Sequence, residues 1–415
     1  MGRVRAIVQT NPLLALFVVA FVVRVAFIFA SGPLDPPVSW GDDASYDRIA
    51  DGMVTRHEYV NTWYPPGYPL FLALVYAVFG RSWLLVRIIQ AGFGAATCVL
   101  TYRLGARVFS QRAGLLAAWL LAIYPGHVFF SWRIMAETLY MLMLLVSLLL
   151  ALALADNPRP LRAVVVGLTL GFAQLVKSNL FPFPVLLVVW FAFAARTGIK
   201  QRGLCLGALI AGFVLMSALT PLANFLSPAG SVHALPGNAG TGLWQGNNPL
   251  ANGYFNCAET QPAGQAFIAR HGFKERLEHA DAFEQDRLYR TLALLWIREN
   301  PGTFLVLCLK KLNNAFGLFP RAVVFDASPV ARVVHWLSYG LMAPFALAGL
   351  LLAGRRWRAW ALLYAVLCSY LVMVLIFYGT PRNTILVIPC LLLFASPAML
   401  AVRDRVFRSD RLTGH

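Results

Sequence analysis

Long apolar segments separated by short polar ones dominate the chain. About 20 mostly apolar residues are enough for a helix to cross the hydrocarbon core of a bilayer. The pattern predicts ten membrane-spanning helices, near residues 11–30, 84–102, 113–131, 134–155, 163–178, 180–196, 203–222, 333–353, 358–378 and 383–402. No small-residue cleavage site follows the first segment, so we interpret it as a retained helix and not as a removed signal peptide.

Two further apolar runs do not fit the pattern of a span. Residues 65–80 form a run that is short for crossing a bilayer, and residues 301–319 carry Lys310, Lys311 and two asparagines in their middle. Such polar groups are costly in hydrocarbon. We therefore expect both runs to lie along the membrane surface.

The distribution of charge predicts the orientation. With ten spans, the segments that share a side with the N-terminus hold 17 Lys or Arg and only three Asp. Lys and Arg are enriched in cytoplasmic loops, so we expect both termini in the cytoplasm and the acidic segments outside. The basic segments are 1–10, 103–112, 156–162, 196–202, 354–358 and the C-terminal tail.

The composition excludes an ordinary soluble domain. Of the 415 residues, 59% are hydrophobic and 13% are charged, whereas soluble domains are about 45–50% apolar. The net charge of +17 would indicate a nucleic-acid partner in a soluble chain. Because the basic residues lie beside predicted spans, we expect the lipid bilayer as a partner and no nucleic acid.

An acidic stretch, residues 41–69, follows the first predicted span. Asp42 and Asp43 begin a helical pattern at the expected membrane boundary. Carboxylates there can accept a proton from an acceptor group or hold a divalent cation. The alternative is that they are solvated or cap the helix that follows.

Three more charged residues lie at the outer ends of predicted spans. Glu137 is in the first turn of an apolar helix, where a carboxylate is costly unless it faces a polar cavity. Lys177 ends a span on the outer side, and Arg382 begins the last span there, with Arg133 in a nearby outer segment. The basic residues could anchor the interface by snorkelling, or they could bind a phosphate.

Acids combined with Lys and Arg at a lipid boundary favour transfer from a phosphorylated lipid. Cations would stabilise the leaving phosphate while a carboxylate activates the nucleophile. The sequence has no HExxH or GxSxG motif, and the glycines of "GLTLGF" and "GFGAAT" lie inside predicted spans, where helix packing explains them. The sequence names no definite cofactor, and a divalent cation at Asp42 and Asp43 is an open alternative. A disulfide between Cys257 and Cys308 is also open.

Several motifs together resemble a known family. Asp42-Asp43 with Tyr46, "YPPGYPLFLALVYAVFG", "AETLY", "LVKS" and "YGTPRNTILVIPCLLL" are similar to membrane glycosyltransferases of the protein-mannosyltransferase and aminoarabinose-transferase type. The resemblance implies an all-α, type-C glycosyltransferase fold with about ten transmembrane helices. It also implies a polyprenyl-phosphate-linked sugar donor and inverting transfer to a glycan, lipid or protein outside the cytoplasmic membrane.

The resemblance also implies roles for single residues. Asp42 or Asp43 matches the position of the base, and Glu137 matches a second acidic position. Lys177 and Arg382 match basic positions near the carrier phosphate. We also expect Arg133 to bind that phosphate, and Tyr46 and Tyr64 to bind substrate. Relatives often carry a charged residue where this chain has Tyr64, which leaves the sugar and the acceptor open.

The sequence divides into three parts: 1–222 with an outer loop at 31–83, an external segment 223–332, and 333–415 with a basic tail. The external segment contains "GNAGTGLWQGNNPLANGYF". Trp244 and Asn247 there could bind a sugar or acceptor, or the segment could be a surface loop. Alternatives to a transferase are a flippase for a lipid-linked glycan, which would favour an internal repeat that the chain lacks, and a non-catalytic assembly subunit.

Overall fold

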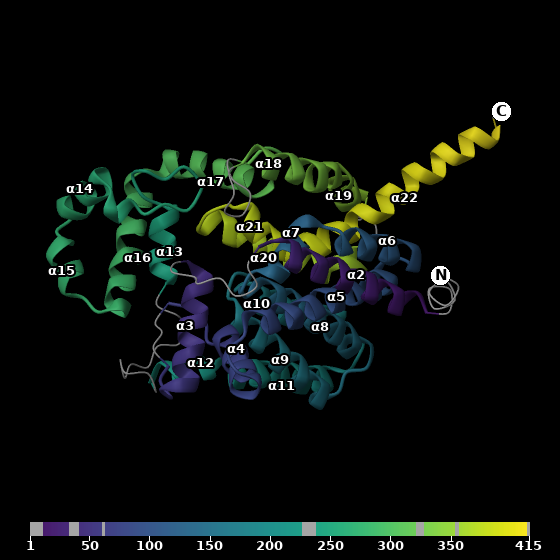
Figure 1. The fold of residues 1–415 in the computed structure, drawn as a ribbon, viewed down its shortest axis with the longest axis horizontal. Coiled ribbons are helices and arrows are strands. Elements are labelled where there is room, and N and C mark those ends of the chain that lie inside the picture. The colour runs from purple at the N-terminus through teal and green to yellow at the C-terminus, as the bar shows by residue number, and fades with distance from the viewer. Residues whose placement is uncertain are drawn as a thin grey trace.

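The structure of the protein is a computed structural model, which describes residues 11–32, 41–59, 63–225, 238–320, 328–352 and 357–412. All regular elements in these ranges are helices (Figure 1). In chain order the α-helices are α2 (Pro12–Ala30), α3 (Asp42–Thr55), α4 (Gly67–Phe79), α5 (Trp83–Val108), α6 (Gln111–Ala122), α7 (Pro125–Trp132), α8 (Glu137–Asp156), α9 (Pro160–Val176), α10 (Phe183–Ala194), α11 (Ile199–Ser217), α12 (Leu219–Phe225), α13 (Ala239–Gly246), α14 (Pro262–Arg270), α15 (Lys274–His279), α16 (Ala282–Glu299), α17 (Pro301–Phe316), α18 (Pro329–His335), α19 (Leu341–Leu352), α20 (Trp357–Ile376), α21 (Pro381–Thr384) and α22 (Ile388–Leu412). Short 3₁₀ turns at Ala258–Thr260 and Ile385–Val387 and a π-turn at Trp336–Gly340 complete them.

Each of the ten predicted spans coincides with a helix or a pair of helices. Six helices in the described ranges are long and apolar enough to cross a membrane, and a seventh predicted span is the pair α6 and α7, bent by 52°. The remaining three are α9, α10 and α20, which are apolar but shorter. The all-helical prediction is therefore confirmed.

The two doubtful runs are also helices, α4 and α17. The pair α16 and α17 would pass as one apolar span, but the two helices meet at 109°. Leu305 and Leu309 on α17 are exposed, whereas Lys311 on the same helix is fully buried. Whether α4 and α17 lie along the membrane surface stays a prediction.

Small residues let neighbouring helices approach closely. A Cβ atom on Gly167 of α9 would overlap the carbonyl oxygen of Leu209 on α11. A Cβ atom on Gly212 of α11 would likewise overlap the carbonyl oxygen of Val164 on α9. Backbone contact of this kind compensates for the weak hydrophobic driving force between helices in lipid.

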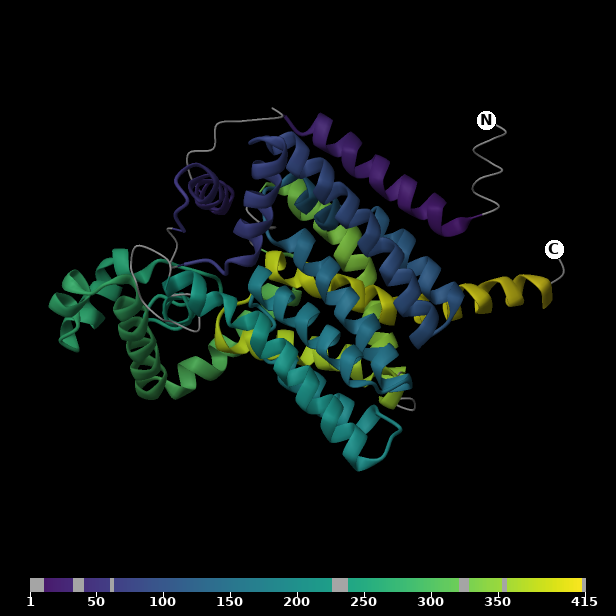
Figure 2. The same cartoon turned by 90° about the horizontal axis from the view of Figure 1, so that it is seen from below.

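The predicted basic loops lie together at one end of the bundle. Arg107 at the end of α5 forms an ion pair with Asp156 at the end of α8. Gln201 of α11 donates to the carbonyl oxygen of Pro158 at 3.1 Å, and Trp360 of α20 donates to that of Val108 at 3.1 Å. The start of α2 and the end of α22 lie at this end as well (Figures 1 and 2). The predicted basic segments 103–112, 156–162 and 196–202 thus share one face with the start of α20, the start of α2 and the end of α22.

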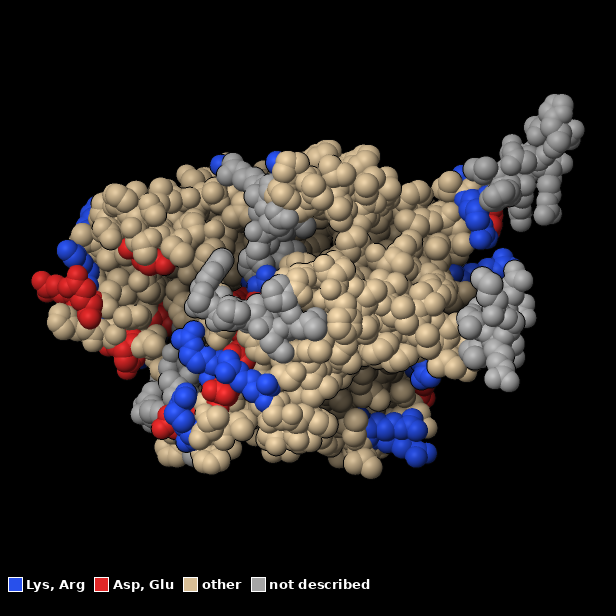
Figure 3. Space-filling model, in the orientation of Figure 1, with Lys and Arg blue, Asp and Glu red and all other residues tan. Residues whose placement is uncertain are grey.

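The opposite end carries residues 238–320 of the predicted external segment, which we call the outer segment. In Figure 2 the green part of the chain, with α14 to α17, projects away from the end that holds the termini. A second hydrophobic cluster, centred on Trp244, Leu292 and Trp296, fills this segment, separate from the core of the bundle. Figure 3 shows most of the acidic side chains in view at this end, over α14 to α16 and near α3.

Candidate functional site

A cavity of about 840 Å³ opens at the end of the bundle that faces the outer segment. Side chains from the start of α3, the start of α5 and the segments after α7, α9 and α20 converge on it. These segments are far apart in the chain but were all predicted to lie on the outer side. The lining includes seven of the predicted site residues: Asp42, Asp43, Tyr46, Tyr64, Arg133, Lys177 and Arg382.

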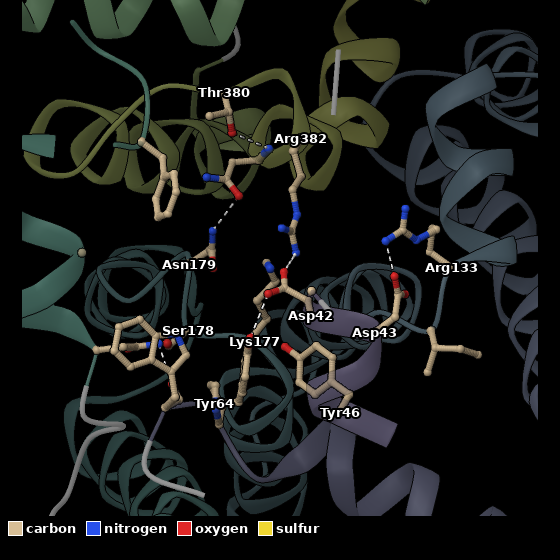
Figure 4. Close-up of a pocket in the computed structure, with 18 of the residues that line it drawn as sticks. Asp42, Asp43, Tyr46, Tyr64, Arg133, Lys177, Ser178, Asn179, Thr380 and Arg382 are labelled. Carbon is tan, nitrogen blue, oxygen red and sulfur yellow. Dashed lines mark hydrogen bonds and ion pairs between the residues drawn. The ribbon is translucent and has the colours of Figure 1, made fainter. Parts of the chain in front are cut away.

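Acidic and basic side chains alternate along the floor of the cavity, and Figure 4 shows the ion pair between Arg382 and Asp42. Arg382 Nη2 lies 2.6 Å from Asp42 Oδ2, and Arg382 Nε lies 2.8 Å from Glu137 Oε1. Lys177 Nζ lies 3.3 Å from the same Glu137 oxygen. One carboxylate oxygen therefore positions both cations side by side.

Glu137 lies beneath the cavity and does not line it. Its side chain is 0% exposed, and its Oε2 atom has no hydrogen-bond partner among the described residues. A buried carboxylate is costly unless it is paired. Glu137 therefore pairs with Lys177 and Arg382 from beneath the cavity, and its catalytic role stays a prediction.

The local sequence explains how the two cations reach the floor. Lys177 directly follows the last residue of α9, and Pro381 starts the short helix that carries Arg382. The Thr380 side chain caps this helix at the backbone N–H of Asn383. Asn179 Nδ2 donates to Asn383 Oδ1 at 3.1 Å, which ties the two segments together.

Asp42 and Asp43 are adjacent in sequence but have different environments. Both oxygens of Asp42 are occupied, because Oδ1 accepts from the Tyr64 hydroxyl at 2.8 Å and Oδ2 pairs with Arg382. Asp43 is 5% exposed and pairs with Arg133, and its Oδ1 atom has no partner within the part of the chain that the structure describes. Burial raises the pKa of Asp43, and Arg133 opposes that shift. Gly41, at φ 92°, supplies the turn that leads into α3.

Tyr46 and Tyr64 form an aromatic wall beside the acids. Their ring centroids lie 4.6 Å apart, and Tyr46 also meets the edge of Tyr68 at 4.8 Å. Tyr64 is the donor that holds Asp42, so the residue that departs from the family pattern has a defined contact here. The two tyrosines thus fix the position of the first turn of α3.

Trp244 and Asn247, predicted to bind substrate, are not brought to the cavity. Trp244 is fully buried against Phe267 and Tyr289 in the outer segment. Asn247 is also fully buried; it accepts from Lys311 Nζ at 2.8 Å and donates to the carbonyl oxygen of Ile376. Both stabilise the outer segment and its junction with α20.

The structure separates Arg133 from the other two cations. Arg133 pairs with Asp43, and in Figure 4 this pair lies on the opposite side of Asp42 from Asn179. The prediction grouped Arg133 with Lys177 and Arg382 around one phosphate, but its contact in the structure is with a carboxylate. Its role in phosphate binding stays a prediction.

A group of lining residues next to Arg133 was not predicted from the sequence. Arg87 is 3% exposed, and its Cζ atom lies 5.7 Å from the Trp83 ring and 5.4 Å from the Trp132 ring. Such distances are those of cation–π contacts. A charged residue one turn into the outer end of an apolar run was the available signal, the same one that identified Glu137.

The carboxylates do not form a metal site. Among the described residues there is no group of three or more His, Cys, Asp or Glu side chains that could hold an ion. Asp42 and Asp43 are each paired with a guanidinium group, which occupies the position that a cation would take. The residues present therefore do not fit the divalent cation that the sequence suggested. All six cysteines, including Cys257 and Cys308, are free thiols.

Comparison with known proteins gives one family match. Residues 64–220 match the family model of dolichyl-phosphate-mannose-protein mannosyltransferases, which is less than half of the chain. No curated protein matches the sequence.

Solved structures share the fold over nearly the whole chain. The oligosaccharyltransferase AglB of Archaeoglobus fulgidus, in complex with an inhibitory peptide and a dolichol-phosphate, superposes with a TM-score of 0.57 at 16% identity, covering 98% of this chain and 52% of that one. The same enzyme tethered to an acceptor peptide gives a TM-score of 0.57, with 98% and 51% covered. ArnT of Cupriavidus metallidurans bound to undecaprenyl phosphate covers 94% of this chain and 78% of its own at 16% identity, but its TM-score of 0.38 is too low to compare sites.

The chain spans about half the length of the archaeal oligosaccharyltransferase, and at 16% identity that likeness establishes the fold alone. The chain therefore has the type-C glycosyltransferase fold, and its resemblance to membrane glycosyltransferases of the protein-mannosyltransferase type is confirmed.

Proposed function

We propose that the protein is an integral membrane glycosyltransferase that moves a sugar from a polyprenyl-phosphate-linked donor to an acceptor hydroxyl, with inversion at the anomeric carbon. The observation that carries the proposal is the pairing of Lys177 and Arg382 over the buried Glu137, beside two aspartates in one cavity. Two adjacent cations suit a phosphate group, and a guanidinium can bind it with two parallel hydrogen bonds. The archaeal enzyme with this fold is described with a bound dolichol-phosphate, which supports a lipid-phosphate donor.

The unequal aspartates favour a division of roles. Asp43 has a carboxylate oxygen without a partner among the described residues, and burial raises its pKa. Both features suit a general base, which must have a lone pair available for a proton. Asp42 instead restrains Arg382 through its ion pair.

The chemistry then follows in one displacement. Asp43 takes the proton of the acceptor hydroxyl, and the hydroxyl oxygen forms a bond to the anomeric carbon of the donor sugar. The bond from that carbon to the phosphate oxygen breaks, and the phosphate leaves with the electron pair beside Lys177 and Arg382. The products are the glycosylated acceptor, polyprenyl phosphate and a protonated Asp43. Attack opposite to the leaving phosphate inverts the anomeric configuration.

The location of the reaction is part of the proposal. The described basic loops, the start of α2 and the end of α22 share the end opposite to the cavity. Because such loops are retained in the cytoplasm, we propose a multi-pass protein of the cytoplasmic membrane with its cavity on the external side.

The test uses the purified full-length protein reconstituted into lipid vesicles with polyprenyl-phosphate sugars of several kinds. The expected result is formation of polyprenyl phosphate and a labelled glycoside when a cell-envelope extract supplies acceptors, and no product with Asp43→Asn. A flippase would instead move the intact donor across vesicles without cleaving it. That outcome, with no polyprenyl phosphate formed, would overturn the proposal.

A further inference from the structure

Part of the cavity wall comes from the outer segment. Gln245 of α13 and Phe255 line the cavity there, together with Tyr378, which follows the end of α20. Gln245 is only 6% exposed although it belongs to the lining, so the small surface that it exposes faces the cavity. The reaction proposed above uses none of these three residues.

Direct contacts hold these residues in one wall. A Cβ atom on Gly246, the neighbour of Gln245, would overlap the carbonyl oxygen of Phe377. The rings of Phe255 and Tyr378 meet edge to face, with 5.8 Å between their centroids. The end of α13, the loop that follows it and the end of α20 therefore present Gln245, Phe255 and Tyr378 together.

The turn at the end of α13 explains why Gln245 reaches the cavity when its neighbours do not. Successive residues of an α-helix are rotated by about 100° around its axis. Trp244 packs into the hydrophobic cluster of the outer segment, and Asn247 binds Lys311 and the carbonyl oxygen of Ile376. Gln245 is therefore the residue of this turn that faces the cavity.

The wall carries polar groups without a partner. Within the part of the chain that the structure describes, the side-chain amide of Gln245 and the hydroxyl of Tyr378 form no hydrogen bond. Neither group is sealed off by the surrounding protein, so both are accessible from the cavity. A largely buried amide is costly unless it is hydrogen-bonded. A sugar hydroxyl matches both groups, because it can donate to Gln245 Oε1 and accept from Gln245 Nε2 or from the tyrosine.

The wall adjoins the cations assigned to the donor phosphate. Tyr378 precedes Arg382 by four residues, and both line the cavity. Phe181, in the segment that follows Lys177, meets the ring of Phe377 with 6.2 Å between the centroids. In a sugar phosphate the sugar ring is joined to the phosphorus through a single oxygen. A group that lies beside the bound phosphate is therefore the donor sugar.

We infer that Gln245 and Tyr378 bind hydroxyl groups of the donor sugar and determine which sugar is transferred. The inference rests on the proposed function, because it assigns the donor phosphate to Lys177 and Arg382. Gln245, Tyr378 and Phe255 are all uncharged, so the face of the sugar that they contact carries hydroxyl groups and no charged substituent.

The experiment measures binding of donors to the purified full-length protein in detergent micelles by calorimetry. The ligands are undecaprenyl phosphate and its mannosyl, glucosyl and galactosyl esters. The donor that binds most tightly is then compared with its monodeoxy forms, each of which lacks one hydroxyl. We expect at least one deoxy form to bind about two- to tenfold more weakly than its parent, because a hydrogen bond between neutral groups contributes about that much.

Two variants connect the lost hydroxyl to the wall. Gln245→Met keeps the length of the side chain and removes the amide, so it should weaken the parent donor by about two- to tenfold and leave undecaprenyl phosphate unchanged. The deoxy form that lacks the contacted hydroxyl should bind this variant as well as it binds the wild type, because the contact is already absent. Tyr378→Phe, which removes only a hydroxyl, should show the same pattern.

Gln265→Met is the matched control. Gln265 is an exposed residue of α14 that does not line the cavity. This variant should bind every ligand as the wild type does. Binding of undecaprenyl phosphate shows that a variant is folded; if Gln245→Met does not fold, Tyr378→Phe still tests the inference.

Several results would overturn the inference. One is an unchanged donor affinity in a variant of Gln245 or Tyr378 that still binds undecaprenyl phosphate. Another is an equal loss for undecaprenyl phosphate and for the donor. A third is a loss of the same size for the parent donor and for every deoxy form. Binding of undecaprenyl phosphate by the wild type without binding of any of the three donors would also overturn it. Failure of the wild type to bind undecaprenyl phosphate would instead count against the proposed function, so the two failures are distinguishable.

Discussion

Arg382 and Glu137 are 245 residues apart in the chain, yet Arg382 Nε donates to Glu137 Oε1 at 2.8 Å beneath the cavity. The same oxygen accepts from Lys177. The contact joins the start of the last membrane helix to the start of α8. A single carboxylate thus sets the separation of two cations that come from different parts of the fold.

Glu137→Gln should lower kcat while making polyprenyl phosphate bind more tightly. The amide keeps the shape but no longer neutralises Lys177 and Arg382, so the cations lose their fixed positions and attract a phosphate more strongly. Losing hydrogen bonds to a charged group costs about 1.5–3 kcal/mol. Steady-state kinetics and product-inhibition constants for the variant and the wild type give both quantities. An unchanged inhibition constant would argue against the positioning role.

Arg382→Ala and Lys177→Ala should each weaken use of the donor and leave use of the acceptor unchanged. Removing one charge-assisted contact predicts a loss of about ten- to hundredfold in apparent donor affinity. Arg382→Lys should rescue only in part, because an ammonium lacks the planar fork. Donor titration at saturating acceptor measures the effect. If both alanine variants keep the wild-type donor affinity, the residues are interface anchors.

Asp43→Asn should reduce turnover more than Asp42→Asn does. Loss of a general base costs about 10²–10⁴-fold in rate, whereas Asp42→Asn removes a restraint on Arg382 and should act chiefly through the donor. Single-turnover rates with bound donor separate the two effects. Equal rates for Asp43→Asn and the wild type would assign the base to another residue.

Arg133→Met should shift the acidic limb of the pH–rate profile to higher pH. Burial raises the pKa of Asp43 and Arg133 lowers it, so removal of Arg133 leaves the effect of burial unopposed. The base form of Asp43 is then lost at a higher pH as the solution is acidified. The measurement is kcat/KM against pH for both proteins. A limb that stays in place or moves to lower pH would contradict Asp43 as the base.

Reporter fusions should show the loops at Asn157 and Gly198 in the cytoplasm and Gly253 outside. The first two positions lie in or beside basic loops that contact each other through Gln201 and Pro158, and Gly253 lies in the outer segment. A fusion at Gly253 that reports cytoplasmic would require a different number of spans.

Hydropathy and the cost of placing charge in hydrocarbon were enough to predict the membrane helices and three charged residues of the site. The ten apolar segments form helices because apolar surroundings offer no hydrogen-bond partners and a helix satisfies its own backbone groups. Glu137, Lys177 and Arg382 could be singled out because a charge at the end of an apolar run needs a partner. The sequence could not show that these three partner one another, since that depends on how α8, α9 and α21 pack.

Two features of the site were not predicted from the sequence: one lies in a segment without strong periodicity and the other lies inside a predicted span. Trp244 and Asn247 lie in a glycine- and asparagine-rich stretch that resembles a ligand-binding loop, but packing against α16 and α20 buries both. Arg87 was overlooked because it lies a full turn inside a predicted span. A guanidinium at that depth is as costly in hydrocarbon as the carboxylate of Glu137, so its position in the sequence already indicates a polar surrounding.

The arrangement of two cations over one carboxylate also has a consequence for turnover. A polyprenyl-phosphate sugar is a phosphodiester with one negative charge, whereas the released phosphate monoester carries about −1.5 to −2 at neutral pH. Lys177 and Arg382, only partly neutralised by Glu137 and Asp42, should therefore hold the spent carrier more strongly than the fresh donor. Under the proposed function, the number of unoccupied donor sites would depend on removal of polyprenyl phosphate from the membrane. The recycling of that lipid would then limit the rate of glycosyl transfer.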